Sequence, residues 1–131
     1  MKQNIFDKIS SEKYINLQTQ RKDGNFVSTP VWFVIKDDEI FIRSGSNSGK
    51  IKRIRNNKNV KFASCNIKGK IKGEVYDAIA NFEFTSDYKE INLLFDKKYR
   101  VMVSLLKIFY KLKKINLKIV SLKLKDKSTT N

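Results

Sequence analysis

The feature that most constrains the fold is an alternation of apolar and polar residues, broken by turn signals, over the first two-thirds of the chain. Tyr14–Gln20 alternates as a half-buried β-strand does, because successive strand side chains point to opposite faces. Lys22–Asn25 follows and contains an Asp-Gly pair, which supplies the positive φ angles of a tight hairpin turn. The beginning of the chain therefore predicts a β-hairpin.

The second strand of this hairpin is expected to be long, covering Phe26–Lys36. Within it, Val31–Ile35 is apolar at every position, so we expect both of its faces to be covered and the strand to be central in the sheet. Pro30 cannot donate a ladder hydrogen bond, which indicates an edge, a bulge or a ligand at that point.

The rest of the chain predicts a mainly β domain with a few helices. Six strands with a short helix after the third, and helices before the last, favour a six-stranded closed or partly open barrel. We expect one domain over residues 1–131, a core over about residues 12–125, and loose ends at Met1–Asn4 and Asp126–Asn131. The remaining expected strands are Glu39–Arg43, Val60–Ile67, Glu74–Phe84 and Leu117–Lys125. Two of the expected helices are Ser48–Asn57 and Val101–Lys114. A third is capped by Ser86 and buries Ile91, Leu94 and Phe95.

Composition excludes several kinds of site. The chain has no histidine and one cysteine, Cys65, so zinc sites, Ser-His-Asp triads and Cys-His dyads are excluded and no metal is expected. A single cysteine forms no internal disulfide, which indicates a reducing, cytoplasmic location. No stretch has the length of a membrane span or the form of a signal peptide.

Positive charge is concentrated in the middle of the chain. The 28 basic and 13 acidic residues give a net charge of +15, and ten basic residues and no acidic one lie between Glu39 and Glu74. Such a field indicates an anionic partner, although a solvated lysine-rich surface explains the total equally well. A non-catalytic nucleic-acid binder is one alternative, but the sequence shows no recognition helix or stacking platform. Attachment to a membrane, or to an apolar ligand, through the amphipathic Val101–Lys114 segment is another.

Two segments have the composition of a binding site. Ser28–Phe33 combines hydroxyls, a proline and a tryptophan on one strand, which suits a planar ring lying against the backbone. An ordinary bulge with Trp32 in the core explains the same residues. Arg43–Arg53 passes from a strand through a Gly/Ser loop into a helix, which suits an anion because helix N-termini present free N–H groups. A solvated polar loop is the alternative, and the Gly-Lys spacing is one residue short of a P-loop.

These segments resemble a known family. The resemblance lies in Tyr14–Leu17, Arg21–Gly24, Val27–Phe33, Ile42–Gly45, Ser48–Asn57, Ala63–Cys65 and Gly69, and it covers about residues 12–100. They look like the pyridoxamine 5′-phosphate oxidase-class, deazaflavin-dependent enzymes of the FMN-binding split-barrel superfamily.

What the resemblance implies is a six-stranded split barrel that forms a homodimer with a cofactor, FMN or deazaflavin, at the subunit interface. The implied function is that of an oxidoreductase that transfers electrons or hydride through the cofactor; no catalytic residue is assigned and the substrate stays open. Non-catalytic members of the same fold, which bind flavin, haem-like or lipid ligands, are the alternative. The residues that would hold the cofactor are Arg43, Ser44, Ser48 and Lys50 at the phosphate, Thr19, Ser28, Thr29, Pro30 and Val31 beside the ring, and Arg53 at the tail.

Overall fold

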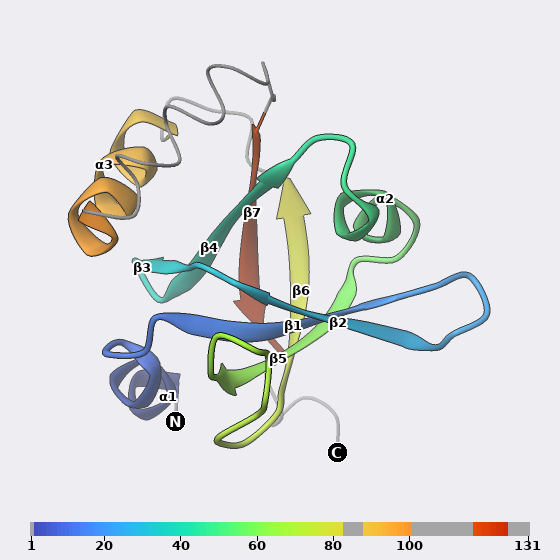
Figure 1. Ribbon diagram of the computed structural model, residues 1–131, viewed down its shortest axis with the longest axis horizontal. Helices are drawn as coiled ribbons and strands as arrows, with labels where there is room; N and C mark the ends of the chain where they lie inside the picture. Colours follow the sequence, from blue (N-terminus) through green and yellow to red (C-terminus); the bar gives the residue numbers. More distant parts are fainter. Residues whose placement is uncertain (1, 83–87, 101–116, 126–131) are drawn as a thin grey trace.

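The described residues form one curled antiparallel sheet with three helices around it. The computed structural model describes residues 2–82, 88–100 and 117–125, and all statements below concern these residues. The elements are, in chain order, α1 (Lys2–Ile9), β1 (Tyr14–Gln20), β2 (Phe26–Val31), β3 (Val34–Lys36), β4 (Glu39–Gly45), α2 (Gly49–Asn56), β5 (Asn59–Cys65), β6 (Tyr76–Phe82), α3 (Tyr88–Lys98) and β7 (Leu117–Leu124) (Figure 1).

The order of the strands requires the sheet to curl. The order is β2-β1-β5-β6-β7-β4-β3, so two strands that are consecutive in the chain occupy opposite edges of the sheet. Only Trp32 and Phe33 separate β2 from β3, and two residues span too short a distance to cross a flat sheet of this width. The two edges must therefore approach each other, which gives a partly closed, split barrel.

The barrel interior is apolar because alternate residues of its strands point inward. These residues form one buried cluster, which α2 joins through Ile51 and Ile54, both fully buried. The inward residues of the longer strands are Ile15, Leu17, Ile40, Ile42, Val60, Phe62, Ala78, Ala80, Val120 and Leu122. A second cluster lies on the outer side, between α3 and the sheet, and consists of Val34, Phe41, Ile91, Phe95, Tyr99 and Ile119.

Tyr99, directly after α3, holds the break between β2 and β3. Its ring stacks on Trp32 with 4.3 Å between centroids, and its hydroxyl accepts the Phe33 N–H at 2.9 Å. The same hydroxyl can donate to the Lys13 carbonyl oxygen, 2.8 Å from its own oxygen, or to the Phe33 carbonyl oxygen, at 2.9 Å. Lys98 also donates to the Phe33 carbonyl, at 3.0 Å. Side chains therefore satisfy the buried backbone groups of Phe33 that no neighbouring strand pairs.

The structure confirms the mainly β fold and corrects the number of strands. The described residues contain seven strands, because the expected strand Phe26–Lys36 is divided at Trp32–Phe33 into β2 and β3. The expectation that Val31–Ile35 is central is wrong, since both strands are edges. The run is apolar on both sides because the barrel interior covers one side and α3 with Tyr99 covers the other.

The N-terminal helix was not expected from the sequence. Residues 2–4, expected to be loose, belong to α1, and Phe6 and Ile9 are buried in the main core, which therefore begins before residue 12. The helix at 49–56, its inward Ile51 and Ile54, and the strands β1 and β7 agree with expectation. Ser86 and the Val101–Lys114 segment lie outside the described residues. Within those described, no helix has both the length and the apolar character needed to cross a bilayer.

The Tyr99 contacts can be tested by removing one oxygen. Tyr99→Phe leaves the buried N–H of Phe33 without a partner, so we expect the free energy of unfolding to fall by about 1–3 kcal/mol. Tyr14→Phe is the matched control, because its hydroxyl makes no hydrogen bond to the described residues. Urea unfolding measures both variants; an equal, small effect in the two would contradict this assignment.

Candidate functional site

Helix α2 closes the end of the barrel at which β1 and β4 finish. The helix begins here because Ser48 caps it: the Ser48 side chain accepts the Ile51 N–H at 3.3 Å, and the Ser48 N–H donates to the Gly45 carbonyl. Ile51 and Ile54 then fix the helix against the core. The first turn of α2 is thereby placed over the last residues of the two strands.

A polar cluster gathers between α2 and these strand ends. Ser44 alternates with Ile40 and Ile42 and so points inward, where its Oγ lies 2.9 Å from the Oγ of Ser48. The Lys50 ammonium donates to Ser44 at 3.1 Å. We call Thr19, Ser44, Ser48, Lys50 and Arg53 the α2 cluster.

Two cations of the α2 cluster lie close together. Arg53 donates through Nε to Thr19, a buried residue at the end of β1, at 2.7 Å. A side chain at Gly49 would come within 2.9 Å of the guanidinium, so glycine leaves space for Arg53 at the helix N-terminus. Burial and the neighbouring charge of Arg53 lower the pKa of Lys50. Neither cation forms an ion pair with a carboxylate in the described part of the chain. The cluster is therefore suited to accept an anion.

Arg43 is not brought into the α2 cluster. It follows Ile42 on β4 and points to the opposite face, beneath α3, where its guanidinium donates to Asn92 at 2.9 Å and lies 4.3 Å from the centre of the Phe95 ring. The alternation of side chains along a strand already separates Arg43 from Ser44. The structure thus joins five of the ten expected binding residues and places Arg43 elsewhere.

The four expected ring residues on β2 are divided between two faces of an edge strand. Thr29 and Val31 pair with Leu17 and Ile15 and face the interior, whereas Ser28 and Pro30 pair with Gln18 and Asn16 and face outward. Because β2 is an edge, part of its backbone is left without a neighbouring strand. Pro30 is tolerated here because an edge position does not need its N–H.

Asn16 is a residue of this region that the sequence did not indicate. Its amide donates to the Gly69 carbonyl at 2.8 Å and holds the β5–β6 connection beside Pro30, whose ring is 3.5 Å from the position of a Gly69 Cβ. Gly69 has a φ of +90°, which favours glycine. The Asn16 Oδ1 is buried without a hydrogen-bond partner in the structure described. A buried amide on a strand gives no local signal, because its partner is distant in sequence.

Metal binding finds no support among the described residues, which contain no cluster of three or more histidine, cysteine, aspartate or glutamate side chains placed to hold an ion.

The comparisons with known proteins identify the fold. No protein-family model matches the chain, and no curated protein matches it in sequence. Solved structures do match: the haem storage protein HutZ from Vibrio cholerae has a TM-score of 0.71 at 12% identity, over 95% of this chain and 89% of that one. A protein from Listeria innocua that is provisionally assigned as a pyridoxamine 5′-phosphate oxidase has a TM-score of 0.63 at 12% identity, over 95% and 94%. An FAD-binding protein from Mesorhizobium loti has a TM-score of 0.66 at 12% identity, over 96% and 89%.

These likenesses place the chain in a structural class. Its curled antiparallel sheet has the split-barrel fold of these solved structures, which are described as a provisionally assigned pyridoxamine 5′-phosphate oxidase, a haem storage protein and an FAD-binding protein.

The α2 cluster can be tested with a simple anion. The lowered pKa of Lys50 means that its charged form costs folding free energy near neutral pH, and a bound anion offsets this cost. Phosphate at about ten times its dissociation constant should stabilise the protein by about 1.4 kcal/mol, a rise in melting temperature of about 3–6 °C.

Thermal unfolding in phosphate and in chloride of equal ionic strength measures this effect. Lys50→Met should abolish the rise in phosphate, while Lys123→Met, an exposed site on β7, should keep it. The same rise in all three proteins would refute a site at α2 and indicate a general salt effect.

Proposed function

We propose that the protein binds a phosphate-bearing flavin-type cofactor and acts as an oxidoreductase through it. The observation that carries the proposal is a pair of cations beside the hydroxyls of Ser44 and Ser48. Lys50 is in the first turn of α2, the guanidinium of Arg53 reaches back to Gly49, and neither has a carboxylate partner among the described residues. These donors fit a phosphate group, which accepts charge-assisted hydrogen bonds on several oxygens. One fold neighbour, which is described as an FAD-binding protein, supports the same class of ligand.

The division of work between cofactor and protein follows from the residues present. When bound, a flavin-type ring would supply electron or hydride transfer, which explains why the chain needs neither histidine nor a reactive cysteine. The single thiol, Cys65, is buried, and burial raises its pKa. The protein would hold the phosphate at the α2 cluster and present the edge of β2 to the ring.

A haem ligand fits these residues less well. Haem iron is most often held by histidine or by a cysteine thiolate. The chain has no histidine, and Cys65 is buried inside the β5 strand. We therefore favour flavin over haem, although one fold neighbour stores haem.

Titration with FMN tests the proposed phosphate site. Lys50→Ala and Arg53→Ala should each weaken FMN binding about tenfold or more, since a hydrogen bond to a charged group contributes about 1.5–3 kcal/mol. Lys70→Ala is the control, because Lys70 is an exposed cation on the β5–β6 connection. Flavin fluorescence gives the dissociation constants, and equal losses in all three variants would exclude the α2 cluster as the phosphate site.

The same titration distinguishes two cofactors. A deazaflavin tail continues past its phosphodiester into carboxylates, and exposed cations on and after α2, namely Lys52, Arg55 and Lys58, extend the positive surface from the cluster. We propose that the protein binds deazaflavin more tightly than FMN. The difference between the two affinities should shrink as the salt concentration rises, because salt screens exposed ion pairs. Tighter binding of FMN, or a difference in affinity that does not change with salt, would assign FMN instead.

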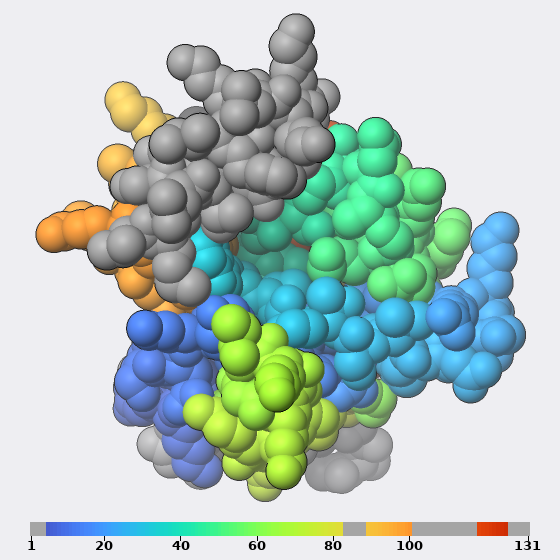
Figure 2. Space-filling view, in the orientation of Figure 1, coloured from blue at the N-terminus to red at the C-terminus, as the bar shows by residue number. Residues whose placement is uncertain are grey.

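The protein is further proposed to be a homodimer. Three large apolar side chains of the β5–β6 connection are exposed: Ile67 at 66%, Ile71 at 40% and Val75 at 43%. Figure 2 shows this connection projecting from the face on which β2 also lies. Neighbouring exposed apolar residues favour an interface, and this one would border the proposed ring position.

Light scattering at micromolar concentration should therefore give twice the mass of one chain, and Ile67→Asp should give the mass of a single chain because it would bury a charge at the interface. Leu93→Asp, at an exposed site on α3, is the matched control and should remain dimeric. A single-chain mass for the wild-type protein would reject the dimer.

A further inference from the structure

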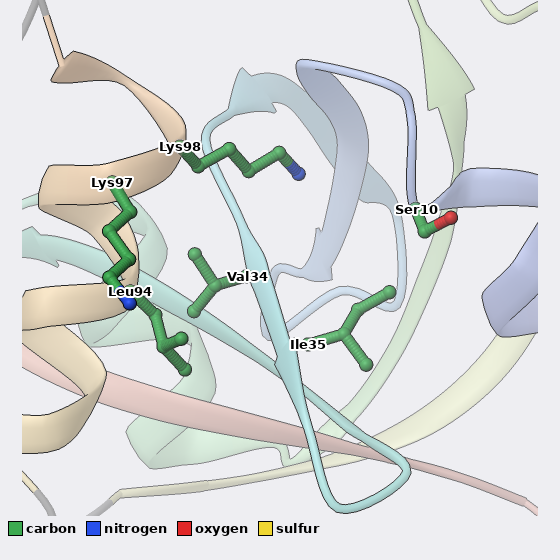
Figure 3. Close-up of a pocket in the computed structure, with 6 residues that line it drawn as sticks. All are labelled: Ser10, Val34, Ile35, Leu94, Lys97 and Lys98. Carbon is green, nitrogen blue, oxygen red and sulfur yellow. The ribbon is translucent and has the colours of Figure 1, made fainter.

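A cavity lies away from the α2 cluster, between α3, the edge strand β3 and the residue that follows α1. It has a volume of about 350 Å³, which is in the range of small-molecule sites. Figure 3 shows α3 on one side, β3 in the middle and the segment after α1 on the other side. The residues that line it are Ser10, Val34, Ile35, Leu94, Lys97 and Lys98.

The walls of this cavity are apolar because it follows the free edge of β3. Val34 and Ile35 are neighbours on the strand and point to opposite faces, yet both line the cavity, Val34 toward α3 and Ile35 toward Ser10 (Figure 3). Leu94 extends the apolar surface from α3. No further strand pairs with β3 on its outer edge, so an apolar ligand can lie along that edge.

Two ammonium groups adjoin these walls. Lys98 extends over β3, and Lys97 runs beside Leu94 (Figure 3). Lys98 donates to the Phe33 carbonyl, and its burial lowers the pKa to about 8, against the opposite effect of the Glu12 carboxylate. Neither lysine forms an ion pair in the described part of the chain.

The carboxylates nearby are already engaged. Glu12 pairs with Lys72 at 2.6 Å, and Glu90 on α3 pairs with Lys36 at 3.2 Å. The positive charge at the cavity is thus not neutralised by these two acidic groups. Lys98 is half-buried and Lys97 is exposed, and two ammonium groups beside an apolar wall favour an anionic ligand.

This cavity is separate from the proposed cofactor site. It adjoins the start of β4, where Val34 pairs with Phe41, whereas Ser44 lies at the other end of the same strand. The two sites also use different helices, α3 and α2.

We propose that this cavity binds a small amphiphilic anion, a carboxylate with an unbranched or aromatic apolar body. The apolar body lies against Val34, Ile35 and Leu94, and the carboxylate faces the ammonium group of Lys97, with the charge of Lys98 adding to the positive field. The site is independent of the flavin-type cofactor, so it stands whether or not that cofactor binds.

Calorimetric titration with octanoate tests the site, with octanol as the neutral ligand of the same chain length. We expect octanoate to bind and octanol to bind at least about tenfold more weakly, because octanol carries no negative charge to attract the ammonium groups. Lys97→Glu should weaken octanoate about tenfold, since it replaces an attraction by a repulsion. Lys89→Glu is the matched control: it is exposed on the same helix, makes the same change in net charge and does not line the cavity.

Each result decides the proposal. The assignment is supported if Lys97→Glu loses octanoate binding while Lys89→Glu keeps it. Unchanged binding in Lys50→Met separates this site from the α2 cluster. Leu94→Gln should weaken octanoate and octanol alike, because it replaces part of the apolar wall by a polar amide. Equal binding of octanol and octanoate, equal losses in Lys97→Glu and Lys89→Glu, or no binding of octanoate at millimolar concentration would overturn it.

Discussion

The contact of Tyr99 with the backbone of Phe33 is the constraint on which the closed shape of the barrel depends. The chain leaves one edge of the sheet at Val31 and joins the other edge at Val34, so the two residues between them have no strand neighbours. Phe33 is buried, and its buried backbone groups need partners. Tyr99 and Lys98 supply these partners from the end of α3, while Trp32 stacks on the Tyr99 ring. Burial raises the pKa of the Tyr99 phenol, so it keeps its proton at neutral pH.

The same closure creates both proposed binding sites. At one end, α2 fills the opening with Ile51 and Ile54, and its N-terminus brings Lys50 beside Ser44. On the outer side of the sheet, α3 leaves part of the β3 edge uncovered, and the cavity next to Lys98 remains there. Cations lie at both places because the helices that pack on the barrel bring long polar side chains beside apolar strands.

Local patterns predicted the elements whose formation is decided locally. The alternation of Tyr14–Gln20, the Asp-Gly turn and the helix that starts at Ser48 all depend on neighbouring residues, and the structure has each of them. The sequence missed α1, because a short amphipathic helix is stable only through the burial of Phe6 and Ile9 against distant strands. Arg43 shows a different relation between pattern and structure. The alternation of β4 already places Arg43 and Ser44 on opposite faces of the strand, whereas the motif groups them at one phosphate.

The sequence by itself determined that the protein is mainly β, that a helix begins at Ser48 and that its chemistry excludes histidine-based catalysis. Only the tertiary structure decided which strands are edges. An apolar run such as Val31–Ile35 has the same sequence pattern whether neighbouring strands or a helix cover it. It also decided that Arg53 meets Thr19 and that Lys98 meets Phe33, pairs separated by 34 and 65 positions in the chain. Such contacts depend on how the sheet curls, and no local pattern encodes the direction or the extent of that curl.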